Sequence, residues 1–119
     1  MKRIILVFIL VVLADSARLE AHAFLKDAEP AVGSTVETSP KEVRVRFTEN
    51  IEPAFSSTKV FDSSGKQVDK RDAHLDPSDR ALLHVSVPPL ESGTYKVVWR
   101  VVSVDAHVTN GSFTFRILH

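Results

Sequence analysis

Asp105 and His107 lie two residues apart at the end of a strongly apolar stretch, and both carry side chains that bind metal ions. Alternate side chains of an extended strand share one face, so both are predicted on the face of Trp99 and Val101. Their positions in such a strand are about 7 Å apart, near enough for the two side chains to converge on one ion. By itself the pair also fits a simple polar strand end.

A third candidate ligand is His22, if processing makes it the first residue of the chain. An N-terminal histidine chelates through its α-amine and its own Nδ1. Together with Asp105 and His107 it forms a set of three nitrogens and one oxygen, which suits the tetragonal preference of Cu(II). Zinc is the weaker alternative, because divalent affinity at a nitrogen-rich site peaks at copper. Cu(I) prefers sulfur ligands, and the chain has no cysteine and one methionine, Met1.

The beginning of the chain has the pattern of an export signal. Two basic residues precede the apolar run of residues 4–14, which is too short to cross a bilayer but typical of a secretory leader. Small residues allow cleavage at four positions, after Ala14, Ser16, Ala21 or Ala23. Cleavage after Ala21 leaves His22 as the N-terminus, whereas cleavage after Ala23 fits the A-x-A rule better but discards the histidine. The residues alone leave this choice open.

The charge and composition exclude several classes of protein. The chain has 15 Lys and Arg against 15 Asp and Glu, a formal net charge of 0, and no basic stripe, so nothing indicates nucleic-acid binding. Without cysteine, an exported domain must be held together by sheet packing and not by disulfides. No serine stands in an activated Ser-His-Asp setting, so we expect no enzyme.

The remaining segments are typical of short strands separated by turns. In residues 41–49, Val43, Val45 and Phe47 are expected to face inward, with Glu49 continuing that row past the core. Other strands are expected at residues 22–28, 57–62, 66–68, 81–87, 93–107 and 112–117, and a surface loop at 69–79. About seven strands, with turn signals about every ten residues, predict an all-β fold, an antiparallel β-sandwich or small Greek-key barrel.

The other histidines are weaker candidates. His84 falls on the outward row of its strand and is expected to be solvated. His74 lies in the polar segment beside Asp72 and Asp76, where it is a candidate for an accessory metal contact.

Several stretches match the pattern of one family together: His22 at the start, then residues 29–34, 47–50, 93–97 and 99–115. On these residues the chain from His22 onward resembles the CopC family of periplasmic copper-resistance proteins. The resemblance implies an immunoglobulin-like or cupredoxin-like antiparallel Greek-key β-sandwich and a mature chain that begins at its histidine. It therefore implies a signal peptide at 1–21 and one copper-binding domain at 22–119.

The same resemblance implies which residues bind copper. It places Cu(II) ligands at His22, Asp105 and His107, and it makes Glu49 a group outside the ligand shell that orients the amine or a ligand water. Where the family commonly has glycine between Asp and His, this chain has Ala106, which resists a positive φ, so we expect an ordinary turn there. Some members carry a Met-rich Cu(I) site that this chain lacks, so the expectation is restricted to Cu(II).

The function implied is that of an exported, monomeric periplasmic protein that sequesters or carries Cu(II) in copper homeostasis and resistance. A CopD-type inner-membrane copper transport protein is the implied partner. Two alternatives stay open. One is a histidine-brace copper oxidase, against which Asp105 argues because a brace needs three nitrogens and open positions for oxygen. The other is a metal-free accessory β-sandwich domain. Copper-dependent oxygen consumption separates the oxidase from a carrier, and failure to bind copper selects the accessory domain.

Overall fold

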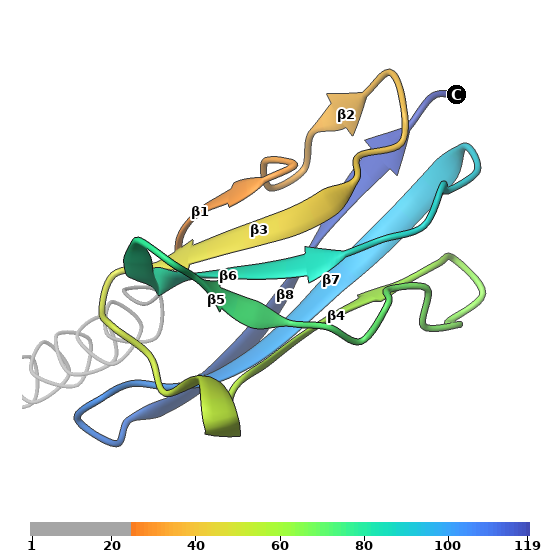
Figure 1. The fold of residues 1–119 in the computed structure, drawn as a ribbon. Helices are drawn as coiled ribbons and strands as arrows, with labels where there is room; N and C mark the ends of the chain where they lie inside the picture. The colour runs from red at the N-terminus through yellow and green to blue at the C-terminus, as the bar shows by residue number, and fades with distance from the viewer. Residues whose placement is uncertain (1–24) are drawn as a thin grey trace, which may run out of the picture.

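Two four-stranded sheets pack face to face in the computed structural model, which describes residues 25–119 (Figure 1). The first sheet has the order β1-β3-β6-β5 and the second the order β2-β8-β7-β4. The elements are β1 Leu25–Glu29, β2 Thr35–Val36, β3 Glu42–Phe47, the short 3-10 helix η1 Pro53–Phe55, β4 Ser57–Phe61, β5 His74–Asp76, β6 Asp79–Ser86, β7 Gly93–Val102 and β8 Val108–Ile117. This confirms the all-β sandwich, with one parallel pair, β2 and β8, among otherwise antiparallel neighbours.

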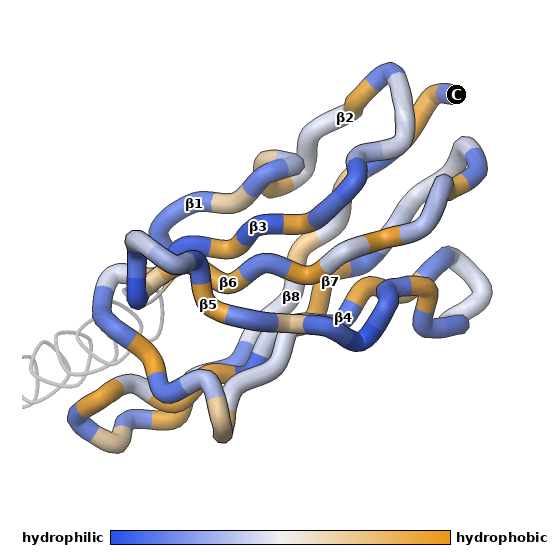
Figure 2. The backbone as a smooth tube through the Cα atoms, viewed as in Figure 1, coloured by the Kyte–Doolittle hydropathy of each residue, from blue (hydrophilic) through white to orange (hydrophobic). Residues whose placement is uncertain are grey.

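The core is built from the alternating residues of the long strands. In β3, Val43 and Val45 are fully buried and Phe47 nearly so, while the residues between them point outward. Figure 2 shows this alternation of hydrophobic and hydrophilic residues along β3. The four residues of β7 predicted to face inward are buried: Tyr95, Val97, Trp99 and Val101. Every second side chain of these strands points into the space between the two sheets. The apolar side chains from both sheets therefore form one continuous core.

Trp99 packs the β7–β8 hairpin against β3. Its ring meets that of Phe47 edge to face, with 5.2 Å between the ring centroids. Gly111 on β8 is paired with Trp99, and a Cβ atom at that position would lie 2.6 Å from the indole ring. A glycine is needed there because the ring lies directly against the backbone of β8.

Two expectations about the connecting segments are wrong. Residues 69–79 are not only a loop, because β5 lies within them and pairs with β6 at the edge of the first sheet. Three residues are too few for an alternating pattern to be recognised. The expected strand at 66–68 is reduced to a single bridge between Phe61 and Gln67. No membrane-spanning helix is found among the described residues.

Candidate metal centre

Asp105 and His107 lie in the turn between β7 and β8, at one end of the sandwich (Figure 1). The alternation of β7 persists through Ser103, whose side chain is buried, and the two candidate ligands beyond it are exposed. The prediction of one strand through His107 is therefore wrong, because β7 ends at Val102. The chain reverses here because the Ser103 N–H donates to the His107 carbonyl at 2.9 Å, which closes the turn before β8 begins.

Ala106, between the two candidate ligands, adopts the left-handed conformation with φ of +71°. The expectation of an ordinary turn at this residue is wrong. Its N–H donates to the Ser103 carbonyl at 2.9 Å, so the hydrogen bonds of the tight turn impose a conformation that alanine alone disfavours.

A single hydroxyl group connects the two candidate ligands. The Ser103 hydroxyl donates to Asp105 Oδ1, and the same hydroxyl accepts the His107 N–H at 3.1 Å. The other carboxylate oxygen, Asp105 Oδ2, lies 3.3 Å from His107 Nδ1. The Ser103 hydrogen bond, aided by the nearby His107, lowers the pKa of Asp105 below its ordinary value. The carboxylate is thus an anion at neutral pH and suited to a cation.

The geometry of this pair fits two neighbouring ligands of one metal ion. Two ligand atoms each about 2.0 Å from a metal and at right angles to one another are about 2.8 Å apart. The separation of 3.3 Å between Asp105 Oδ2 and His107 Nδ1 is close to that value. Both side chains are open to solvent, with 53% and 75% of their surfaces exposed, so an ion can reach them. Within residues 25–119, no group of three or more His, Asp or Glu side chains gathers as a metal site.

The segment that follows β3 runs beside this turn. Glu49 is exposed and does not continue the inward row of β3, because the strand ends at Phe47. The carbonyl of Asn50 accepts the N–H of Val104 at 3.1 Å, and the next residue, Ile51, forms a bridge with Ser103. The segment that carries Glu49 is therefore hydrogen-bonded to the segment that carries Asp105.

The described chain begins at the same end of the sandwich. Leu25, its first residue, is paired with Phe47 at the end of β3. Figure 1 shows the start of β1 and the β7–β8 turn at this end. His22 and the predicted signal peptide at 1–21 lie outside the described residues.

Comparison with known families identifies this architecture. The model of the CopC domain family matches residues 25–118, nearly all of the described chain. The chain belongs to the CopC domain family.

Relatives of this chain cover most of its length. Protein YobA of Escherichia coli K12 is 35% identical over 98 residues, which are 82% of this chain and 79% of YobA. Copper resistance protein C of Pseudomonas syringae pv. tomato is 33% identical over 110 residues, with 86% and 85% covered. The crystal structure of CopC from Methylosinus trichosporium OB3b has a TM-score of 0.74 and 38% identity, covering 81% of this chain and 93% of that one.

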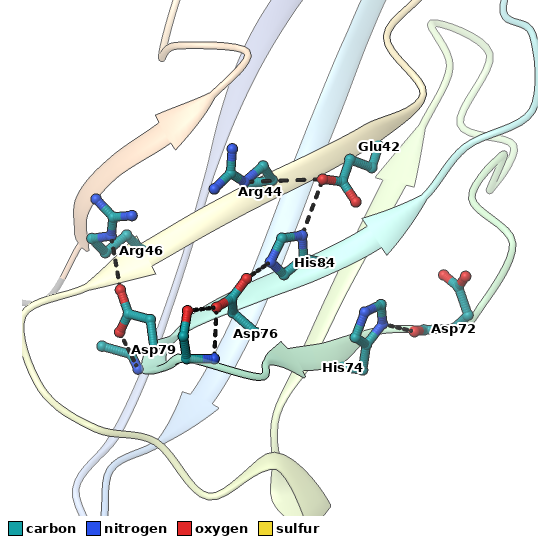
Figure 3. Close-up of polar contacts among 10 residues, drawn as sticks. Glu42, Arg44, Arg46, Asp72, His74, Asp76, Asp79 and His84 are labelled. Carbon is teal, nitrogen blue, oxygen red and sulfur yellow. Dashed lines mark hydrogen bonds and ion pairs between the residues drawn. The ribbon is translucent and has the colours of Figure 1, made fainter.

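A second polar cluster of this CopC domain lies on the outer face of the first sheet, away from the turn (Figure 3). His84 was expected to be solvated, and this is wrong, because only 11% of its side chain is exposed. Its Nε2 lies 2.7 Å from Asp76 Oδ1 and its Nδ1 lies 3.1 Å from Glu42 Oε1. His74 stacks on His84 with 5.5 Å between ring centroids. Since carboxylates engage both ring nitrogens, His84 joins three strands and has no nitrogen left for a metal.

Proposed function

We propose that this CopC-family protein is an exported Cu(II)-binding protein that sequesters or carries copper in copper homeostasis and resistance. The observation that carries the proposal is the exposed pair Asp105 and His107, whose ligand atoms lie 3.3 Å apart on the turn of a CopC domain. Several relatives are named for copper, among them copper resistance protein C of Pseudomonas syringae and the copper transport protein CutJ of Bacillus subtilis. The nitrogen- and oxygen-containing side chains, in a chain without cysteine, favour Cu(II) over Cu(I).

His22 supplies the remaining nitrogens in this proposal, after removal of residues 1–21. Its α-amine and Nδ1 complete a set of three nitrogens and one oxygen. The position of Leu25 supports this assignment, since the start of β1 lies at the end of the sandwich that carries the turn. Three residues span at most about 10 Å, so a ligand three positions before Leu25 would be within reach of that end. Glu49, on the neighbouring segment, orients the amine or a ligand water from outside the ligand shell.

The proposal includes the cellular setting. The apolar run at 4–14 supports export to the periplasm by a cleaved signal peptide. There the protein acts as a monomer that exchanges copper with a CopD-type inner-membrane protein.

Copper titration of the chain that begins at His22 tests the proposed function. One equivalent of Cu(II) is expected to bind. Asp105→Ala or His107→Ala should each weaken binding more than about 100-fold, because removing a ligand lowers metal affinity more than removing a group that only orients a ligand. Competition with a chelator of known affinity measures this. His119→Ala is the control, because it removes an exposed imidazole at the C-terminus, at the opposite end of the sandwich from the turn (Figure 1), and it should bind as the parent does. Unchanged affinity in Asp105→Ala would refute the site.

A further inference from the structure

Ser103 is an unusual polar residue at the inner end of the turn. Three polar side chains are buried within residues 25–119, and Ser103, with no exposed surface, is the most deeply buried of them. A buried hydroxyl is costly unless it is hydrogen-bonded, so its partners explain why it is there. Those partners are the two candidate copper ligands.

The Ser103 hydroxyl contacts both candidate ligand residues. It donates its one hydrogen to Asp105 Oδ1 in preference to the more distant His107 carbonyl at 3.4 Å, and its oxygen accepts the backbone N–H of His107 at 3.1 Å. The donated bond sets the rotation of the Asp105 carboxyl group. The accepted bond sets the backbone from which the His107 imidazole projects. One buried oxygen atom therefore orients both ligands.

The same arrangement determines which carboxylate oxygen is free to bind an ion. Because Oδ1 is engaged by Ser103, Asp105 offers Oδ2, and this is the oxygen that lies 3.3 Å from His107 Nδ1. A carboxylate that offers one oxygen suits tetragonal copper, which takes one atom at each position. Calcium often takes both oxygens of a carboxylate, so the arrangement is less suited to it.

We propose that Ser103 is a positioning residue for copper, which holds the Asp105 carboxylate and the His107 backbone so that their ligand atoms face the same ion. This role rests on the proposed function. Ser103 does not touch the metal itself and acts only through its two hydrogen bonds.

Removing the hydroxyl tests the role in the chain that begins at His22. Ser103→Ala is expected to weaken Cu(II) binding about 10- to 100-fold, the usual cost of losing a group that orients a ligand. Ser103→Thr keeps the hydroxyl and should restore most of the affinity. Ser103→Gly also lacks the hydroxyl and replaces the alanine variant if that variant does not fold.

Ser56→Ala is the matched control. The Ser56 hydroxyl accepts the Val102 N–H at 3.0 Å and donates to the Glu52 carbonyl at 2.7 Å. It therefore supports the same end of β7 without contacting either ligand. Its loss should leave copper affinity unchanged, whereas an equal loss in Ser56→Ala and Ser103→Ala would overturn the positioning role.

Two further readouts separate positioning from a merely structural effect. The electron paramagnetic resonance spectrum of bound Cu(II) should change in Ser103→Ala, because the carboxylate is free to rotate, and should stay that of the parent in Ser56→Ala. In an Asp105→Ala background, Ser103→Ala should cost much less affinity than in the parent. Full additivity of the two losses, or a parent spectrum in Ser103→Ala, would overturn the role.

The outcomes also distinguish this role from the proposed function. If the parent binds copper through Asp105 and Ser103→Ala binds equally well, the role of Ser103 is refuted and the copper site stands. If Asp105→Ala binds as the parent does, the proposed function fails and the role of Ser103 fails with it.

Discussion

Ala106 is the residue whose conformation shapes the candidate copper site most directly. It lies between Asp105 and His107 with φ of +71°. A residue with a Cβ atom loses roughly 1–2 kcal/mol in the left-handed region. The surrounding hydrogen bonds offset this cost, because the Ser103 backbone bonds both to Ala106 and to His107. The turn that carries the two candidate ligands is therefore strained at Ala106.

Replacing Ala106 with glycine should relieve that strain. Ala106→Gly is expected to keep or raise the free energy of unfolding, by up to about 1 kcal/mol, since relief of the left-handed cost outweighs the added freedom of the unfolded chain. Urea denaturation of the metal-free protein measures this. Ala81→Gly, within β6, is the control and should lower the free energy by about 0.5–1 kcal/mol. Equal destabilisation by both substitutions would contradict the strain.

Asp76, the last residue of edge strand β5, is the centre of several polar contacts. Asp76 accepts the Ser78 hydroxyl at 2.7 Å and the Ser78 N–H at 2.9 Å, and it faces His84 of β6. The bonds from Ser78, followed by that from His84, lower the pKa of Asp76 from 3.8 to about 2. Ionised Asp76 thus favours the folded state.

The stability of the protein should depend on pH through Asp76. A carboxyl group whose pKa is lower in the folded state stabilises the fold above its ordinary pKa of 3.8, and this contribution is lost as the pH falls toward about 2. Asp76→Asn should therefore be less stable than the parent at pH 7, with a difference that shrinks between pH 4 and pH 2. Denaturation at each pH measures the difference. A difference that stays constant down to pH 2 would contradict this assignment.

The whole molecule brings three separate segments to one end. The start of β1, the segment after β3 and the β7–β8 turn lie at that end, where β1 pairs with β3 at Leu25 and Phe47 and Val104 donates to the Asn50 carbonyl (Figure 1). In the proposed site, copper held by His22, which precedes β1, and by the β7–β8 turn would link the two sheets. In a chain without disulfides such a link should add to the stability of the whole sandwich.

Cu(II) should therefore raise the melting temperature of the chain that begins at His22. At a free copper concentration of 100 times Kd, the free energy of unfolding should rise by about 2.7 kcal/mol, and a chelator should reverse this increase. One alanine added before His22 removes the terminal amine from that residue and should abolish most of the shift. Thermal unfolding followed by circular dichroism measures both. The same shift with and without the added alanine would show that the N-terminal histidine is not a ligand.

The sequence by itself determined the core and the identity of the two candidate ligands in the turn. Residues such as Val43, Val45 and Trp99 follow a period of two, and burial on one face of a strand needs no more than that pattern. The roles of His22 as a copper ligand and of Glu49 as a group outside the ligand shell stay predictions.

The tertiary structure alone decided where β7 ends, the left-handed Ala106, the double hydrogen bond of Ser103 and the partners of His84. The partners of His84 depend on which residues of distant strands lie opposite one another, whereas the conformation of Ala106 and the bonds of Ser103 depend on the hydrogen bonds that close the β7–β8 turn. Glu42 and His84 are 42 residues apart in the chain, and only the pairing of β3 with β6 brings them into contact. A local pattern carries no record of such pairing, because register is set by the packing of the whole sheet.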